Sequence, residues 1–180
     1  MSGTAKEIEI KILGVDRSSL EEKLVSLGAE KVFDDEIHAL YYDFPDNAIR
    51  LKSCTLRLRR EGEKSVFTLK KDLESREAKV REEHEVEVSD FAGMKHLLET
   101  LGMNIWLEVK KHRTSYEFKG VRFEIDAYHD AYSYIPQFLE IEGRDIETIY
   151  AYAELLGFKK NDCKPWDILQ VAAYYLKKSD

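Results

Sequence analysis

The fold is decided by the stretch Glu7-Ile8-Glu9-Ile10-Lys11, which is the first of three similar units in the 180-residue chain. Each unit has two glutamates separated by one residue, then an aspartate, an amphipathic segment and a Leu-Gly pair. The second unit contains Glu83-His84-Glu85, and the third contains Glu140-Ile141-Glu142. Side chains of a β-strand point alternately to opposite faces, so each pair places two carboxylates on one face. The repeat therefore predicts a sheet with one polar, functional face.

Strand and helix patterns continue along the rest of the chain. Period-two alternation predicts eight strands, at about residues 6–13, 36–44, 54–60, 64–71, 79–88, 106–118, 121–129 and 137–142. Amphipathic spacing predicts four helices, at about residues 16–28, 90–102, 145–157 and 166–178. Lys119-Gly120 predicts a tight hairpin, and Pro165 predicts that the last helix begins directly after it. No low-complexity linker interrupts the pattern, so we expect a single domain over residues 1–180.

Composition excludes several classes of protein. The formal net charge of −7 argues against a surface that coats nucleic acid. Cys54 and Cys163 are far apart and have no metal-ligand spacing, which favours a reducing compartment. No apolar run approaches the roughly 20 residues needed to cross a bilayer, and the polar start Met1–Glu7 lacks the apolar centre of a signal peptide. We therefore expect a cytoplasmic protein with no nucleic-acid or membrane partner.

Charged side chains of both signs share one face of the predicted strands, opposite Ile, Val, Leu and Phe. The cations on this face are Arg57, Arg59, Lys70, Arg81, Lys111 and Arg113. An ordinary antiparallel sheet with one face in water would also carry such charges, with each cross-strand pair contributing about 0.2–1 kcal/mol. However, strands 54–60 and 64–71 are almost purely cationic, whereas strands 6–13 and 137–142 are mostly anionic. This partition argues against a merely solvated sheet. If the strands close, the result is an α+β fold in which a closed eight-stranded antiparallel β-barrel has a polar, charged lumen and helices on its outer apolar face.

A lumen with this composition predicts its ligand. Clustered arginines and lysines suit a ligand of high negative charge, because the planar guanidinium matches phosphate oxygens. Carboxylates in the same space would repel that ligand unless a divalent cation lay between them. Mg²⁺ and Mn²⁺ prefer oxygen ligands and commonly bridge carboxylates to substrate phosphates. The residues therefore predict a Mg²⁺ or Mn²⁺ cofactor and a small phosphate-rich substrate.

The successive motifs also resemble those of a known superfamily. They are Glu7-x-Glu9-x-Lys11, Leu56-Arg57-Leu58-Arg59, Thr68-Leu69-Lys70, Lys79-Val80-Arg81-Glu82-Glu83-His84-Glu85, Lys111-His112-Arg113-Thr114-Ser115-Tyr116, Glu124-Ile125-Asp126 and Phe138-Leu139-Glu140-Ile141-Glu142. In order and spacing they resemble the CYTH superfamily, the triphosphate tunnel metalloenzymes, over nearly the whole chain. The chain is most similar to the class IV adenylyl cyclase-like and thiamine triphosphatase-like proteins of that superfamily. It departs from the family pattern at Ala39, at Tyr134-Ile135-Pro136 and at Trp166, which leaves one tunnel mouth and the non-phosphate end of the substrate undefined.

The resemblance implies a role for each matching residue. The implied metal ligands are Glu7, Glu9, Glu140 and Glu142. The implied phosphate-binding residues are Lys11, Arg57, Arg59, Lys70, Arg81, Lys111 and Arg113. Supporting acids, which hold metal or orient the cations, would be Glu83, Glu85, Glu124 and Asp126. Of these residues, Glu9, Lys11 and Glu142 would be catalytic.

Three functions remain open at this point. The first choice is a class IV-type adenylate cyclase, in which the ribose 3′-hydroxyl of ATP attacks the α-phosphorus and pyrophosphate leaves. The alternative is a triphosphatase, in which water attacks the terminal phosphorus of tripolyphosphate, thiamine triphosphate or a nucleoside triphosphate. A non-catalytic polyphosphate- or nucleotide-binding module ranks third, because it would not need the acidic residues. The resemblance is also compatible with a homodimer.

Overall fold

The computed structural model describes residues 5–73 and 78–179, so most of the polar start lies outside the described residues. Its strands are β1 (Ala5–Leu13), β2 (Glu30–Asp43), β3 (Cys54–Glu61), β4 (Lys64–Leu73), β5 (Lys79–Val88), β6 (Asn104–Phe118), β7 (Val121–Tyr128), β8 (Phe138–Gly143) and β9 (Cys163–Lys164). Its α-helices are α1 (Arg17–Ser26), α2 (Phe91–Thr100), α3 (Ile146–Leu155) and α4 (Ile168–Ser179). Short 3₁₀ helices are η1 (Arg50–Lys52), η2 (Asp130–Tyr132) and η3 (Lys160–Asp162).

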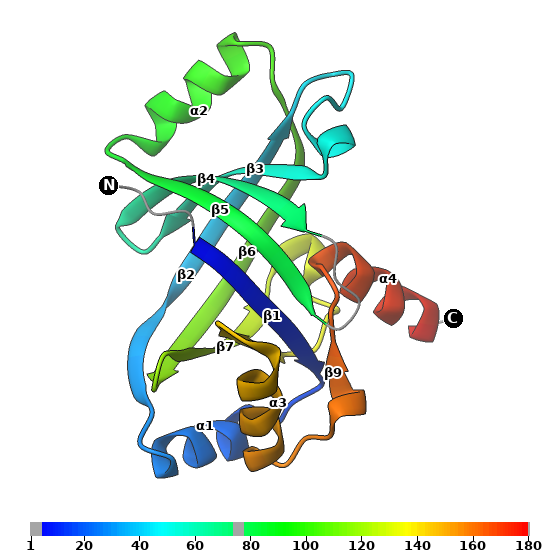
Figure 1. The fold of residues 1–180 in the computed structure, drawn as a ribbon. Coiled ribbons are helices and arrows are strands. Elements are labelled where there is room, and N and C mark those ends of the chain that lie inside the picture. Colours follow the sequence, from blue (N-terminus) through cyan, green and yellow to red (C-terminus); the bar gives the residue numbers. More distant parts are fainter. Residues whose placement is uncertain (1–4, 74–77, 180) are drawn as a thin grey trace.

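The sheet closes into a barrel (Figure 1). Antiparallel neighbours follow the order β5-β4-β3-β2-β6-β7-β8-β1, and β1 pairs again with β5. This closed eight-stranded antiparallel barrel confirms the predicted fold class. The two-residue β9 was not predicted, because two residues carry no periodic signal; it pairs with Lys11 and Ile12 of β1. The prediction also began β2 too late, because its exposed first half lacks an alternating pattern and is ordered by pairing with β6.

The apolar faces of the strands point outward, under helices. Helices α1 and α3 pack together against β1, β7 and β8, as Figure 1 shows at the lower end of the barrel. The buried residues of this cluster include Leu20, Leu24, Ile149, Ala153, Ile10, Ile12, Phe123, Ile125, Leu139 and Ile141. Helix α2 covers β2 and β3 through Leu98. Helix α4 instead packs through Val171 and Ala172 against Phe138, which lies on the same face of β8 as Glu140 and Glu142. Helices on the outer apolar face leave the opposite, charged face to the lumen.

Local interactions explain the hairpin between β6 and β7 and the first residue of α4. Lys119 and Gly120 have φ angles of 48° and 77°, so they form the predicted tight hairpin between β6 and β7. The last helix begins at Ile168 rather than directly after Pro165. The reason is a reciprocal cap: the Gln170 amide donates to Asp167 Oδ1 at 2.9 Å, and Gln170 Oε1 accepts from the Asp167 amide at 2.9 Å.

Among the described residues, none of the helices is both long and apolar enough to cross a membrane.

Candidate functional site in the barrel lumen

The lumen holds a cavity of about 440 Å³. Most of the residues predicted for the site line it: Glu7, Glu9, Lys11, Arg57, Arg59, Lys70, Arg81, Glu83, Glu85, Lys111, Arg113, Glu124, Glu140 and Glu142. Asp126 is the exception, since its side chain is fully buried behind Lys111 and Arg113. Alternation along each strand put these groups on one face, and closure of the barrel brings them into one space.

Strand register decides which of these charges meet. Glu9 of β1 lies directly opposite Glu142 of β8, and two residues further along, Lys11 lies opposite Glu140. On the other side of β1, Glu7 lies opposite Arg81 of β5. Directly opposite residues in an antiparallel pair have Cβ atoms about 4.5–5.5 Å apart. The predicted metal ligands of the first and last Glu-x-Glu units are therefore neighbours, although more than 130 positions separate them in sequence.

Two cations neutralise Glu9. Lys11 Nζ lies 3.1 Å from Glu9 and 3.0 Å from Glu140, and Arg81 also forms an ion pair with Glu9. Burial by itself would raise the pKa of Glu9, but Lys11 and Arg81 outweigh it and hold that pKa well below its ordinary value. Glu9 is therefore an ionised carboxylate fixed between two cations.

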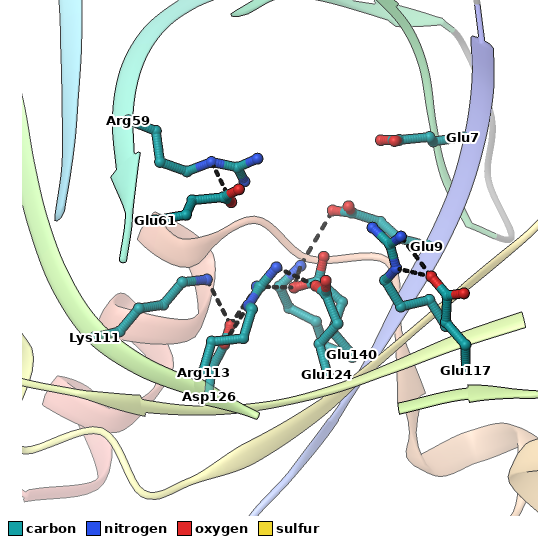
Figure 2. Close-up of polar contacts among 12 residues, drawn as sticks. Glu7, Glu9, Arg59, Glu61, Lys111, Arg113, Glu117, Glu124, Asp126 and Glu140 are labelled. Carbon is teal, nitrogen blue, oxygen red and sulfur yellow. Dashed lines mark hydrogen bonds and ion pairs between the residues drawn. The ribbon is translucent and has the colours of Figure 1, made fainter. Parts of the chain in front are cut away.

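A second cluster lies around Asp126. Arg113 Nε lies 2.6 Å from Asp126 Oδ1, and Lys111 Nζ lies 2.7 Å from Asp126 Oδ2. Arg113 also forms an ion pair with Glu124 and lies 3.7 Å from Glu140 (Figure 2). Although burial opposes ionisation, Arg113 and Lys111 hold the pKa of Asp126 below its ordinary range. Because Asp126 does not reach the cavity, its place in the structure is behind the two cations, where it orients them.

Glu7 and Glu142 are not neutralised in this way. Burial, a hydrogen bond shared with Glu83 and the nearby Glu142 raise the pKa of Glu7 to about 9, although Lys70 lies 3.6 Å away. Lys70 instead pairs directly with Glu83. Burial and the neighbouring Glu124 and Glu140 raise the pKa of Glu142 to about 7. This end of the cavity therefore has too few cations to offset its carboxylates when all of them are ionised, and Glu7 and Glu142 retain protons more readily than ordinary glutamates.

The acidic end suits a divalent cation in its chemistry. Carboxylate oxygens are the ligands that Mg²⁺ and Mn²⁺ prefer, and a cation between Glu7 and Glu142 would take the place of the protons that their raised pKa values retain. Within residues 5–73 and 78–179, no three His, Cys, Asp or Glu side chains are arranged as a ready-made metal site. Glu9 and Glu140 both form ion pairs with Lys11.

The cationic wall of the lumen lies on β3 and β4. No carboxylate of the described residues lies within 4.0 Å of the Arg57 guanidinium, and its Nε is buried without a hydrogen-bond partner. Burial and the adjacent Arg57 lower the pKa of Arg59 to about 10, although Arg59 Nε lies 2.6 Å from Glu61. Figure 2 shows Arg59 and Lys111 facing Glu7 and Glu9 across the lumen. Arg57, whose positive charge no described carboxylate offsets, is what an anionic ligand requires.

Several cavity-lining residues were not predicted. Tyr41, Trp106 and Tyr128 form an aromatic section of the lining, together with Asp167, Ile168 and Leu169 around the start of α4. One signal was available in the sequence: Ile105-Trp106-Leu107 interrupts the alternation at the start of β6, which is where a β-bulge would be expected.

The fold and lumen define a class of protein: closed antiparallel barrels whose interior is a cavity lined by charged side chains of both signs. Comparison with known proteins identifies the family, because the CYTH domain matches residues 5–162. This chain belongs to the CYTH domain family.

Similar proteins cover most of the chain. A Methanocaldococcus jannaschii protein named "Putative adenylate cyclase MJ0240" is 30% identical over 123 residues, which are 67% of this chain and 69% of that protein. The structure of the PH1012 protein from Pyrococcus horikoshii is 29% identical and has a TM-score of 0.76, covering 92% of this chain and 98% of that one. A Hippeastrum protein shares the fold at 18% identity, with a TM-score of 0.65 over 94% of this chain and 95% of its own; its structure is described as revealing a dominant triphosphatase activity.

Proposed function

We propose that this protein is a divalent-metal-dependent enzyme that acts on a small triphosphate compound. The observation that carries this proposal is the partition of the lumen. Cations with incomplete carboxylate partners, above all Arg57, line the same cavity as Glu7 and Glu142, whose charge the nearby cations would not offset when both groups are ionised. A polyphosphate with a bound divalent cation complements both parts at once. Membership of the CYTH domain family supports the same substrate class.

In this proposal the cationic side chains bind phosphate and the acidic side chains bind the metal. Arg57, Arg59 and Lys70 would bind phosphate oxygens along β3 and β4, with Arg113 and Lys111 held in position by Asp126. Glu7 and Glu142 would hold the metal, with Glu9 and Glu140 beside them. When bound, Mg²⁺ or Mn²⁺ would stabilise negative charge on the phosphates. Lys11, held between Glu9 and Glu140, would keep a fixed positive charge close to the reacting phosphate, and such preorganised charge is usually the largest contribution to catalysis.

Two reactions fit these residues. Adenylate cyclisation is the first choice from the sequence, and it is supported by the name of the M. jannaschii relative. It requires the ribose 3′-hydroxyl to lie in line with the α-phosphorus, so the metal-holding acids should lie near the organic end of the substrate.

One observation favours the alternative, a triphosphatase. A second depression borders Glu7 and Glu142, together with Glu117 and Arg122, and includes none of the aromatic lining residues. If the organic group lies at the aromatic section, the acidic end is closer to the terminal phosphate than to the α-phosphate. That arrangement suits attack by water on the terminal phosphorus.

Product analysis separates the candidates. The protein would be incubated with ATP, tripolyphosphate or thiamine triphosphate and Mg²⁺ or Mn²⁺, and the products would be resolved by ion-exchange chromatography. Cyclic AMP with pyrophosphate supports the cyclase, whereas orthophosphate with a diphosphate supports the triphosphatase. Glu142→Gln should abolish either product, and Glu154→Gln, an exposed change on α3, should not. Tight triphosphate binding that is independent of metal, with no product from any substrate, would instead indicate the non-catalytic binding module.

A further inference from the structure

An irregularity in β6 turns a tryptophan toward the cavity. Tyr41 and Tyr42 are consecutive on β2, yet they pair with Leu107 and Ile105 of β6, so Trp106 is an extra residue without a partner on the neighbouring strand. In regular alternation, two adjacent residues point to opposite faces, but both Trp106 and Leu107 line the lumen. A β-bulge re-aims a side chain in this way and is common beside active sites.

The indole of Trp106 is held in place by Arg50. The Arg50 guanidinium lies over its ring, 4.3 Å from the centroid. Arg50 is fixed in turn by the buried Asp43, with Nε 3.0 Å from Oδ2. Asp43 also accepts the backbone amides of Phe44 and Ile49 at 2.8 and 2.9 Å, so the whole support is anchored at the end of β2. Such an indole is preorganised, and little entropy is lost when it binds a ligand.

The hydrogen-bond donor of the same indole is unused. Trp106 Nε1 is buried and has no partner among the described residues. Leaving a buried donor unsatisfied costs free energy, and a native structure usually satisfies every such group. Because the residue lines the cavity, an acceptor on a bound molecule could satisfy this donor.

Tyr41 lies between this indole and Arg57 of the cationic wall. Its ring centroid lies 5.9 Å from that of Trp106, with the planes tilted by 59°. Tyr41 is also directly opposite Arg57 on β3, and the nearby Arg57 charge helps to lower the pKa of the Tyr41 hydroxyl against the effect of burial. A molecule with a ring at Trp106 would therefore have its phosphates next to Arg57.

We propose that Trp106 and Tyr41 form a subsite for the organic group of the triphosphate, and that this group is a planar nitrogen heterocycle with an acceptor atom at its edge. The inference rests on the proposed function and narrows its substrate from any triphosphate to a heterocyclic one. The ring packs against the two aromatic side chains, and its acceptor takes the hydrogen bond from Trp106 Nε1. Nucleobases and the pyrimidine of thiamine both have this chemistry.

The test compares Trp106→Phe with Trp166→Phe. Both changes remove an indole N–H and keep an aromatic ring. Trp166, however, lies outside the cavity lining, and its ring centroid is 5.3 Å from that of Tyr174. Dissociation constants for ATP, thiamine triphosphate and tripolyphosphate would be measured by calorimetry with Ca²⁺ and, separately, without metal. Trp106→Phe should weaken binding of ATP, of thiamine triphosphate or of both by about 3–10-fold and leave tripolyphosphate unchanged. Trp106→Ala should weaken the same ligand by a further 5–100-fold, roughly, through loss of stacking.

Binding can also be observed directly at the indole. The chain has two tryptophans, so Trp166→Phe leaves Trp106 as the only one. Its fluorescence should change when the heterocyclic triphosphate binds and change little with tripolyphosphate. A thermal melt of each variant would establish that it is folded.

Four results would overturn the subsite, and the last of them would also overturn the proposed function. Equal weakening of tripolyphosphate and the heterocyclic ligands by Trp106→Phe would show that the indole only supports the barrel. Unchanged binding of all three ligands would show that it contacts none of them. Wild-type protein that binds tripolyphosphate but neither heterocyclic ligand would refute the subsite while leaving the proposed function standing, whereas failure to bind any triphosphate would refute both.

Discussion

Replacing Glu142 with glutamine should stabilise the metal-free protein at alkaline pH while removing its activity. Burial and the adjacent acids raise the pKa of Glu142 from 4.5 to about 7. The folded protein therefore holds this proton more tightly than the unfolded chain does. Its contribution to stability is fully present below pH 4.5 and is lost as the pH rises through about 7. Glutamine is neutral at every pH, so the variant should lose none of that contribution.

The size of the effect follows from the pKa shift. A shift of one unit corresponds to about 1.4 kcal/mol, so the shift of Glu142 from 4.5 to about 7 corresponds to at most about 3 kcal/mol at pH 8 and above. For a chain of this length, 1 kcal/mol changes the melting temperature by about 2–4 °C, which gives a gain of up to roughly 6–12 °C.

The assay is a thermal melt in EDTA at pH 5 and pH 8.5, for the wild type, Glu142→Gln and the exposed control Glu154→Gln. The gain should be large at pH 8.5 and small at pH 5, and the control should show no gain at either pH. Addition of Mg²⁺ should stabilise the wild type and the control more than Glu142→Gln. The reasoning is refuted if Glu142→Gln melts at or below the wild-type temperature at pH 8.5. It is also refuted if the increase in melting temperature is the same at pH 5 and pH 8.5.

Other changes test the remaining parts of the lumen. Arg57→Ala should weaken tripolyphosphate binding, measured by calorimetry, by about 10–100-fold, because a charged hydrogen bond is lost. The melting temperature should stay nearly unchanged, since no described carboxylate pairs with Arg57. A large loss of stability would contradict this assignment. Arg113→Ala should lower the free energy of unfolding in urea by about 3–5 kcal/mol, because it leaves Asp126 buried with only Lys111 beside it, and a loss below 1 kcal/mol would show that Lys111 is sufficient. The raised pKa values of Glu7 and Glu142, about 9 and about 7, predict that Mg²⁺ affinity increases from pH 6 to pH 9 with release of protons, measurable in buffers of different ionisation enthalpy; equal affinity at pH 6.5 and 8.5 would exclude these ligands.

The sequence by itself determined the composition of each face. Alternation in Glu7-Ile8-Glu9-Ile10-Lys11 fixes which side chains lie together, because successive residues of any strand point to opposite sides. The same local rules predicted the four helices, the hairpin at Lys119-Gly120 and the charged groups that line the lumen. A segment that is short or exposed on both faces has no alternating hydrophobic pattern, so β9 and the first half of β2 were not predicted.

Only the tertiary structure decided how the charges pair. Pairing of β1 with both β5 and β8 places Glu9 between two cations and leaves Glu142 among acids, although both belong to identical Glu-x-Glu motifs. Strand register, which depends on contacts across the whole barrel, made that difference. The same is true of Trp106, whose direction depends on one extra residue opposite β2. Local sequence fixes the side of the strand on which a residue lies, whereas the partner that it meets depends on long-range pairing.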